Sequence, residues 1–270
     1  MIVLLLCGAV LHGAAPGRIV SLAPSLTESL FLLGGGDRLV GCTTYCQKPA
    51  AARQKEKIGT LVKFNLEKIV TLRPDLVLAM EFADRKAIEK LRQLHIRVEL
   101  FPSPRDFADL CDSFLRLGEK LGRAEQAKTI VDAARNGVTA TRGRVKDLPK
   151  VKVFWQLGAK PLFTVTRGNF SHDYIEFAGA INIAADAGSG IYSREEVLRR
   201  NPDVIVIVTM GLVAEEEKRA WQRYSSIDAV KNNRVFIVDS YTYCSPTPTG
   251  FATALEELAV LLHPEIKKRP

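Results

Sequence analysis

The sequence has few of the residues that enzyme active sites use. It contains only four histidines among 270 residues. Of these, His12 lies in an apolar N-terminal segment, His95 ends a predicted surface helix and His263 lies near the C-terminus. His172 alone could approach a ligand cleft, although a place on a helix surface is the favoured interpretation. A nucleophile elbow, a P-loop and a GxGxxG stretch are missing, and no pair of carboxylates stands out for acid–base chemistry. The sequence therefore predicts a protein that is not an enzyme.

The chain also lacks a basic run and an apolar run long enough to cross a bilayer. Its formal net charge is +8, but the Lys and Arg residues are scattered without interleaved aromatic residues, which argues against nucleic-acid binding. The segment 1–15 has about ten apolar residues, where a membrane span needs about 20. Its small residues Gly13 and Ala15 predict a secretory signal peptide and hence a periplasmic protein. No Lys or Arg precedes the apolar core, so a buried first strand is the alternative. Leu6 before Cys7 argues against a lipid anchor at Cys7.

Cysteine is scarce as well, with five in the chain. Cys7 leaves with the predicted signal peptide, so Cys42, Cys46, Cys111 and Cys244 remain. The separation of Cys42 and Cys46 is not a usual metal-binding spacing, and Cys111 falls in a helical pattern that places it in the core. Cys46 could pair with Cys244 or Cys42, or hold a metal within a ligand. Unpaired thiols are the favoured interpretation, because free cysteine is often buried as a small apolar side chain.

What the sequence does have is a regular alternation of apolar runs and helical patterns. Strands are predicted at residues 18–23, 37–42, 74–80, 97–101, 152–157, 203–210 and 234–240, and a last helix at 251–263. Residues 106–145 lack proline and predict two helices, divided at Gly118 and Gly122. The alternation predicts an α/β fold with two lobes of mostly parallel sheet, flanked by helices and joined by a long rigid helix. The predicted limits are a signal peptide at 1–15, lobes at 16–122 and 149–270, and a connecting helix at 123–148.

A weak internal repeat supports the two-lobe interpretation. LEKIVTLRPDLVLA aligns with REEVLRRNPDVIVI, so that Pro74 meets Pro202 and Asp75 meets Asp203. Each copy predicts a helix, a Pro-Asp turn and an apolar strand, and HIRVELF and NNRVFIV follow one helix later. Helix, Pro-Asp and strand often follow one another in α/β proteins, so the repeat alone does not decide the fold.

Two facing lobes predict a shared cleft, because ligands sit beyond the carboxyl ends of the strands in an open parallel sheet. The tripeptide Thr-Tyr-Cys occurs after a predicted strand in each lobe, in TTYCQKP (43–49) and YTYCSPTP (241–248), and we expect the two copies to line opposite walls. The predicted loops are rich in aromatic and small residues, which bind large flat ligands through contact area, although several of the aromatic side chains are expected in the core. The predicted ligand-binding residues are Tyr45, Cys46, Phe64, Phe82, Trp155, Phe170, Tyr241 and Tyr243.

Three stretches of the chain resemble a known family. RIVSLAPSLTESLFLLGGGDRLVGCTTYC, KIGTLVKFNLEKIVTLRPDLVLAMEF and PLFTVTRGNFSHDYIEFAGAINIAAD are similar to segments of periplasmic substrate-binding proteins of ABC importers. The similarity is to the cluster with a rigid connecting helix, which serves cobalamin, haem and ferric siderophores, and most of all to its cobalamin-binding members. It implies a monomeric, non-enzymatic protein without an intrinsic cofactor or metal. Such a protein captures a corrinoid and delivers it to an importer permease with little movement of its lobes.

The resemblance also implies roles for single residues. Tyr45 stands where a tyrosine of the cobalamin binder packs on the corrinoid, whereas Leu61 and Ser189 stand where two of its tryptophans fall. The family docks its importer through a surface carboxylate on each lobe, and Asp84 and Glu195 are the candidates here. Such charges guide docking more than they add affinity. A solvated carboxylate at a helix N-terminus is the alternative interpretation of Glu195.

The unmatched tryptophans leave two alternatives to a corrinoid binder. A haem or ferric-siderophore binder belongs to the same class, but an anionic siderophore calls for several arginines, and Arg18 and Arg167 are the loop candidates. A metal chelatase-like enzyme has similar lobes, but it needs a cleft histidine with carboxylates, which His172 alone could supply.

Overall fold

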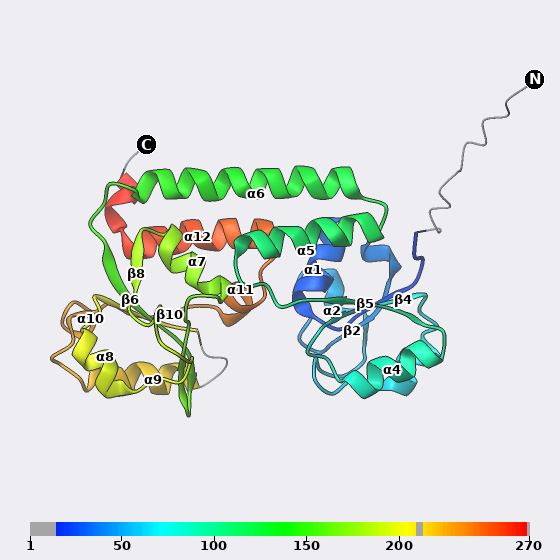
Figure 1. Cartoon of the computed structure of the whole chain (residues 1–270), viewed down its shortest axis with the longest axis horizontal. Coiled ribbons are helices and arrows are strands. Elements are labelled where there is room, and N and C mark those ends of the chain that lie inside the picture. Colours follow the sequence, from blue (N-terminus) through cyan, green and yellow to red (C-terminus); the bar gives the residue numbers. More distant parts are fainter. Residues whose placement is uncertain (1–14, 209–212, 269–270) are drawn as a thin grey trace, which may run out of the picture.

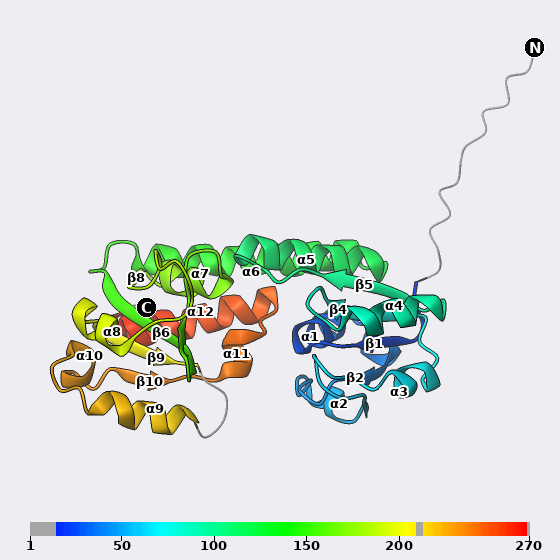
Figure 2. The ribbon, with the colours of Figure 1, turned by 60° about the horizontal axis from the view of Figure 1, so that its bottom comes forward.

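The computed structural model describes residues 15–208 and 213–268 as two α/β lobes that lie side by side under a layer of long helices (Figure 1). Residues 1–14, which hold Cys7 and nearly all of the predicted signal peptide, lie outside the described residues. The predicted fold class is confirmed: each lobe has a sheet flanked by helices, and a long helix joins the lobes (Figure 2). The residue limits of the lobes stay a prediction. Among the described residues, no helix is both long and apolar enough to cross a membrane.

The first lobe is built on a parallel sheet in the order β3-β2-β1-β4-β5. The strands are β1 (Ile19–Ser21), β2 (Leu39–Cys42), β3 (Glu56–Lys57), β4 (Leu76–Met80) and β5 (Arg97–Phe101). Between them lie the helices α1 (Pro24–Leu32), α2 (Ala50–Arg53), α3 (Leu66–Thr71) and α4 (Arg85–Gln93). Strand β4 is buried along its whole length, as an unbroken apolar run predicts for a parallel strand covered on both faces. Because the strands run parallel, their carboxyl ends lie at one edge of the sheet.

The second lobe has a similar sheet with one antiparallel pair. Its strands, in sheet order, are β10 (Val235–Ile237), β9 (Val204–Ile207), β6 (Val151–Ala159) and β7 (Leu162–Thr164), and β8 (Ala180–Asn182) also pairs with β6. Its helices are α7 (Phe170–Phe177), α8 (Arg194–Arg200), α9 (Val213–Gln222) and α10 (Asp228–Lys231). Strand β7 folds back on β6 as a hairpin, whereas β6 pairs in parallel with β8 and β9.

The Pro-Asp repeat is present in the two lobes as the same backbone contact. The Asp75 carboxylate accepts hydrogen bonds from the backbone N–H of Arg18, just before β1, at 3.1 and 3.2 Å. In the second lobe the Asp203 carboxylate accepts one from the backbone N–H of Lys152, in β6, at 2.7 Å. Each aspartate therefore ties the start of its own strand to the start of the neighbouring strand.

The helix that precedes each Pro-Asp pair also ends in the same way. Arg73 and Asn201 have positive φ values of 47° and 44°, in the left-handed region that non-glycine residues seldom adopt. The Arg18 side chain donates to the Arg73 carbonyl at 3.2 Å, and the Lys152 ammonium donates to the Asn201 carbonyl at 2.7 Å. A cation at the start of the neighbouring strand thus caps the helix end in both lobes, where it also complements the helix dipole.

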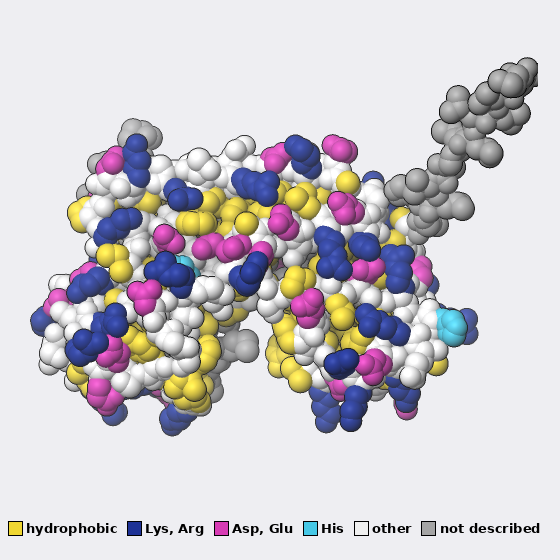
Figure 3. Space-filling model, in the orientation of Figure 1, with side chains coloured by type: hydrophobic (Ala, Val, Ile, Leu, Met, Phe, Trp, Pro, Cys, Tyr) yellow, Lys and Arg dark blue, Asp and Glu magenta, His cyan; other side chains and the backbone are white. Residues whose placement is uncertain are grey.

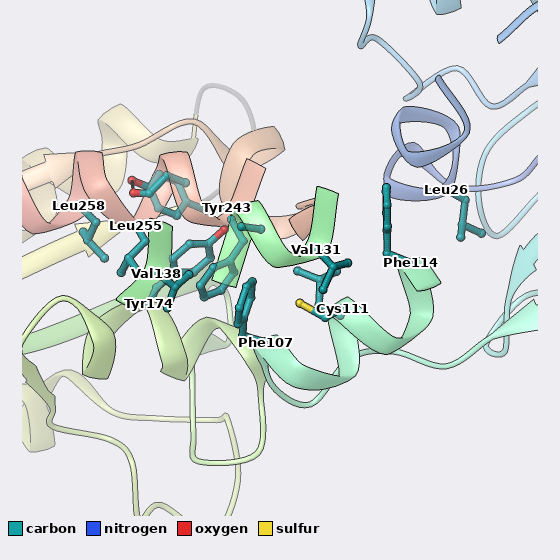
Figure 4. Close-up of a cluster of buried hydrophobic side chains, with 14 of the residues drawn as sticks. Leu26, Phe107, Cys111, Phe114, Val131, Val138, Tyr174, Tyr243, Leu255 and Leu258 are labelled. Atoms are coloured by element: carbon teal, nitrogen blue, oxygen red, sulfur yellow. Dashed lines mark hydrogen bonds between the residues drawn. The ribbon is translucent and has the colours of Figure 1, made fainter. Parts of the chain in front are cut away.

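Three helices, which we call the helix layer, hold the lobes together: α5 (Phe107–Lys120), α6 (Ala124–Val145) and α12 (Pro248–Leu262). They contact one another, and a continuous apolar core runs through them from the first lobe to the second (Figure 4). At its centre the Phe251 ring stacks on Tyr174 with centroids 4.0 Å apart, and lies 4.7 Å from the Phe107 ring. The long helix predicted from the sequence is therefore only one of the elements that join the lobes.

The structure differs from the sequence prediction most clearly after β10. The strand predicted at 234–240 ends at Ile237, and a short helix, α11 (Ser240–Cys244), follows it. Asp239 starts this helix as its N-cap, because its carboxylate accepts from the N–H groups of Tyr241 and Thr242. The second Thr-Tyr-Cys copy therefore lies in a helix rather than in a loop. Helix α9 and the hairpin strand β7 were not predicted either.

Replacing Phe251 with alanine is expected to lower the free energy of unfolding by about 3–5 kcal/mol, since the buried ring packs on two other aromatic rings of the shared core. Urea unfolding followed by circular dichroism measures the change. Phe163→Ala is the matched control, because Phe163 is 41% exposed, and it should cost no more than about 1 kcal/mol. Equal losses in the two variants would contradict the shared-core interpretation.

Candidate ligand-binding cleft between the lobes

A cavity of about 300 Å³ lies between the lobes, next to the helix layer. Its first-lobe wall is formed by the start of α1, the loops after β4 and β5, and one face of α5. Its second-lobe wall is formed by the start of α7 and the segment between α11 and α12. In Figure 3 a notch separates the lobes at the lower edge, and apolar side chains flank it on both sides. The cavity lies beyond the carboxyl ends of the first-lobe strands, where a parallel sheet is expected to bind ligands.

The cavity lining is mainly apolar, and it carries no charged side chain among the described residues. Its apolar side chains are those of Ala23, Pro24, Leu26, Leu61, Met80, Phe82, Phe101, Pro102, Pro104, Leu110, Phe114, Leu117, Phe170, Pro246 and Pro248. Its polar groups are the hydroxyls of Ser25, Ser29, Ser103, Ser113 and Ser245, the Asn169 amide and the Cys244 thiol. Among the described residues, no Lys, Arg, Asp, Glu, His or Tyr lines it. No side chain caps the start of α1, so the backbone N–H groups of its first turn remain available to a ligand.

An open groove of about 730 Å³ continues the cavity along the first lobe. Phe82 lines both the cavity and the groove and lies at their junction. Unlike the cavity, the groove has charged walls, and Arg105 pairs with Asp109 there at 2.8 Å. The cleft therefore offers an apolar chamber and, next to it, a wider polar space.

A set of polar contacts, which we call the interlobe bridge, joins the lobes beside the cavity. Lys48 follows the first Thr-Tyr-Cys copy, and its Nζ lies 3.4 Å from Thr242 Oγ1, 3.9 Å from Asp239 Oδ2 and 4.9 Å from the centre of the Tyr241 ring. The two Thr-Tyr-Cys segments thus face one another across the lobe boundary. Exposed ion pairs and cation–aromatic contacts each contribute about 1 kcal/mol or less, so the bridge can open at little cost.

Glu28, on α1, lies at the same boundary and is half-buried against Thr247, the N-cap of α12. Burial raises the pKa of the Glu28 carboxyl, and the opposing effects of Lys48 and of a hydrogen bond with Thr247 do not cancel that rise. The ionised carboxylate is therefore less favourable in the folded protein than in the unfolded chain.

The structure places two of the eight predicted binding residues on the cavity wall, one from each lobe. Phe82, after β4, is 54% exposed, and Phe170, at the start of α7, is half-buried. Tyr45 is 52% exposed on the loop that carries Lys48, and it does not line the cavity. Tyr241 is half-buried beneath Lys48, and burial raises the pKa of its hydroxyl.

The other four predicted binding residues pack within the protein. Trp155, on β6, is fully buried and stacks on Tyr174, and Tyr243 is 4% exposed in the same aromatic cluster. Cys46 is fully buried and Phe64 is half-buried, both against the first-lobe sheet. They do not reach the cavity because helices cover both faces of each sheet. A residue at or near a strand end can therefore point toward these covering helices and away from the cleft.

The serines and prolines of the lining are not among the binding residues predicted from the sequence. They come mostly from two short segments, PSP at 102–104 after β5 and SPTP at 245–248 between α11 and α12. Such proline-rich segments end regular structure and leave room between the lobes. These two proline-rich segments were the available signal in the sequence, since small neutral side chains do not by themselves indicate a binding site.

The two predicted docking carboxylates are exposed near helix N-termini, one in each lobe. Asp84 is the N-cap of α4 and accepts from the N–H groups of Lys86 and Ala87. Glu195 lies in the first turn of α8 and makes no ion pair with the described residues, whereas its neighbour Glu196 pairs with two arginines of the same helix. Both carboxylates are placed where a partner could reach them.

Comparison with known proteins gives consistent matches. A family model described as periplasmic binding protein matches residues 19–242. The ABC transporter substrate-binding lipoprotein YvrC of Bacillus subtilis is 32% identical over 263 residues, covering 94% of this chain and 82% of that protein. The crystal structure of the periplasmic vitamin B12-binding protein of Vibrio cholerae aligns with a TM-score of 0.78 at 28% identity, covering 94% of this chain and 99% of that one. The periplasmic haem-binding protein of Roseiflexus sp. RS-1 aligns with a TM-score of 0.83 over 92% and 98% of the two chains, and its 23% identity shows the fold alone.

Glu28→Gln is expected to stabilise the protein at neutral pH and to have no effect in acid. Because burial raises the folded-state pKa of Glu28 above its ordinary value of 4.5, the stability present below that value is lost as the pH rises through the folded-state pKa. Urea unfolding of both proteins from about pH 4 to about pH 8 measures the difference. Glu67→Gln, at an exposed position of α3, is the control. A difference that does not grow with pH would contradict the assignment.

Proposed function

Because this chain belongs to the periplasmic binding protein family, we propose that it is the solute-binding component of an ABC importer and captures a corrinoid between its lobes. The observation that carries the choice of ligand is the uncharged lining of the cavity. A corrinoid brings its own metal, its own lower axial ligand and a rim of neutral amides. It therefore needs apolar contact and neutral hydrogen-bonding groups from the protein, which the phenylalanines, the serines and the first turn of α1 supply.

The likeness to the vitamin B12-binding protein of Vibrio cholerae supports this choice, since it extends over nearly the whole of both chains. A corrinoid is larger than the cavity of about 300 Å³, so the proposed ligand also occupies the adjoining groove of about 730 Å³. Phe82, at the junction, would contact the macrocycle where it passes from one space to the other. Tyr45 is proposed as an outer contact, on the exposed loop beside the interlobe bridge.

Haem is the second candidate ligand, and its binding requires other residues than that of a corrinoid. Its iron needs an axial ligand, and its two propionates favour nearby cations. In the described lining of the cavity only Met80, which is 9% exposed, and Cys244 carry atoms that could bind the iron. The arginines of the adjoining groove, Arg105 and Arg116, already pair with Asp109 and Glu99. The likeness to the haem-binding protein extends to the fold alone.

The siderophore and chelatase alternatives have less support. Arg18 is engaged at the start of β1, and Arg167 pairs with Asp186 at 3.1 Å, so neither lines the cavity. His172 is 8% exposed and contacts Asn182 at 3.3 Å within the second lobe. The cavity therefore offers neither arginines for an anionic chelate nor a histidine for metal insertion.

We further propose that the protein is exported, acts as a monomer and docks on its permease through Asp84 and Glu195. The two exposed carboxylates lie one on each lobe, so paired arginines of a permease could orient both lobes at once. The lobe limits proposed for this arrangement are residues 16–122 and 149–270, with the connecting helix at 123–148.

Cyanocobalamin is expected to bind with one site per chain, and more tightly than haem, when either is titrated into the purified protein and followed by calorimetry and absorbance. Phe82→Ala should weaken corrinoid binding about tenfold, which corresponds to about 1.4 kcal/mol of lost aromatic contact. Leu94→Ala, at a 48% exposed position after α4, is the matched control and should bind like the wild type.

Two results would count against this function. Tighter binding of haem, with an absorbance band of an iron–thioether or iron–thiolate bond, would transfer the assignment to haem through Met80 or Cys244. Unchanged corrinoid affinity in Phe82→Ala would remove the junction of cavity and groove from the site. Unchanged affinity in Tyr45→Ala would remove only the outer contact.

Asp84→Asn combined with Glu195→Gln is expected to slow corrinoid uptake by about tenfold in vesicles that contain the permease, because two steering charges are lost. Asparagine also caps helices well, so α4 keeps its N-cap. Corrinoid affinity in solution should not change. The control is Glu89→Gln with Glu196→Gln, which removes one exposed or part-exposed carboxylate from each of the same two helices, α4 and α8. Equal loss of uptake in both double variants would show a general charge effect and no specific docking.

A further inference from the structure

Cys42 and Cys46 form a pair of buried thiols beneath the loop that carries Lys48. Both are fully buried and free. Cys42 ends β2, and a tight turn, closed by a 3.1 Å hydrogen bond from the Cys46 N–H to the Thr43 carbonyl, returns the chain toward it. The Cys42 thiol donates to the Ala52 carbonyl at 3.5 Å, and the Lys57 ammonium contacts both Cys42 Sγ and the Cys46 carbonyl. Neither sulfur lines the ligand cavity, so the proposed function gives the pair no role.

Polar groups surround this pair more densely than two space-filling thiols require. Lys57 Nζ lies 3.2 Å from Cys42 Sγ and donates its other protons to two backbone carbonyls at 2.9 and 3.2 Å. The hydroxyl oxygens of Thr27 and Thr43 each lie 3.1 Å from Cys46 Sγ. The neighbouring Cys42 thiol and these hydroxyls lower the pKa of the Cys46 thiol against the opposing effect of burial. A part-buried ammonium and convergent donors are the environment that activates a thiolate.

We propose that Cys42 and Cys46 are a redox-active dithiol that forms a reversible disulfide, with Cys46 as the attacking group and Cys42 as the resolving group. The oxidant is a small disulfide, RSSR. The Cys46 thiolate attacks one sulfur of RSSR, the S–S bond breaks, and the leaving thiolate takes up the proton that Cys46 released. Cys42 then loses its proton, with Lys57 stabilising its thiolate, and displaces the second RS⁻ from Cys46. The dithiol is oxidised to one disulfide, and RSSR is reduced to two RSH.

The burial of both sulfurs does not prevent this reaction. The residues on either side of Cys46, Tyr45 and Gln47, are exposed, so a local opening of this loop is enough to admit a small oxidant. Oxidation would then link two positions that flank Tyr45, on the loop that reaches across to the second lobe through Lys48. The redox state of the pair is thereby connected to the segment that forms the interlobe bridge.

Peptide mass spectrometry tests the proposal on the folded, ligand-free protein. Both thiols fall in one tryptic peptide, residues 39–53, because Pro49 protects the bond after Lys48. After incubation with oxidised glutathione and alkylation, we expect this peptide to be lighter by two hydrogens and unalkylated, and dithiothreitol should reverse both changes. The proposal is overturned if the peptide is alkylated twice at an oxidant concentration that oxidises the unfolded chain. It is equally overturned if Cys46 pairs with Cys244 or stays as a glutathione adduct.

Lys57→Met tests the role of the ammonium. Loss of the charge is expected to slow disulfide formation about tenfold, because the resolving thiolate loses a charge-assisted hydrogen bond. Lys63→Met, at an exposed position of the same lobe, should react at the wild-type rate. Equal rates in the wild type and Lys57→Met would overturn the assignment of Lys57. Neither experiment uses a corrinoid or a permease, so failure here leaves the proposed function unaffected.

Discussion

Apolar packing within the helix layer fixes how the lobes sit relative to each other. Phe107 from α5 and Tyr174 from α7 both pack on Phe251 of α12, and the same core extends from Leu26 in the first lobe to Leu258 near the end of α12 (Figure 4). Protein interiors are close-packed, so a large rotation of one lobe would have to open voids in this core, each at a cost of several kcal/mol. The width of the cleft is therefore set by helix packing before any ligand arrives.

The two ways of joining the lobes differ in strength, and the difference decides which movement is possible. The helix layer joins them through buried rings, whereas the interlobe bridge joins them through the exposed ammonium of Lys48 and leaves Glu28 half-buried with a raised pKa. Contacts of the second kind form and break at about 1 kcal/mol or less. Small opening movements are thus expected to occur at the bridge, with the helix layer as the axis. A cleft of this kind selects ligands by fit to a nearly fixed wall, which suits the rigid macrocycle proposed as its ligand.

The fold could be predicted from the sequence, but the cavity could be predicted only in part, for a physical reason. Apolar runs of strand length and helical periodicity report burial directly, and β5 occupies the predicted residues 97–101. An aromatic residue near a strand end can face the cleft or the helices that cover the sheet. Which of the two it faces depends on the packing of distant segments. Phe82 follows β4 and lines the cavity, while Trp155 lies within β6 and is buried beneath α7. The serines that give the lining its neutral character have no pattern that a single sequence displays.

The two internal similarities of this chain show when a local pattern carries structural information. The Thr-Tyr-Cys copies are identical in sequence but opposite in burial: Tyr45 is 52% exposed above a buried Cys46, while Tyr243 is 4% exposed beside an exposed Cys244. A turn follows β2 before the first copy, whereas Asp239 starts a helix after β10 at the second copy. The Pro-Asp copies differ in most side chains, yet in each copy the aspartate carboxylate accepts from a backbone N–H at the start of the neighbouring strand. The residue before each proline, Arg73 or Asn201, also has the same left-handed backbone conformation. Backbone groups that must find a hydrogen-bonding partner constrain the chain at every copy of a motif, whereas side chains in connecting segments take whichever side the neighbouring elements leave open.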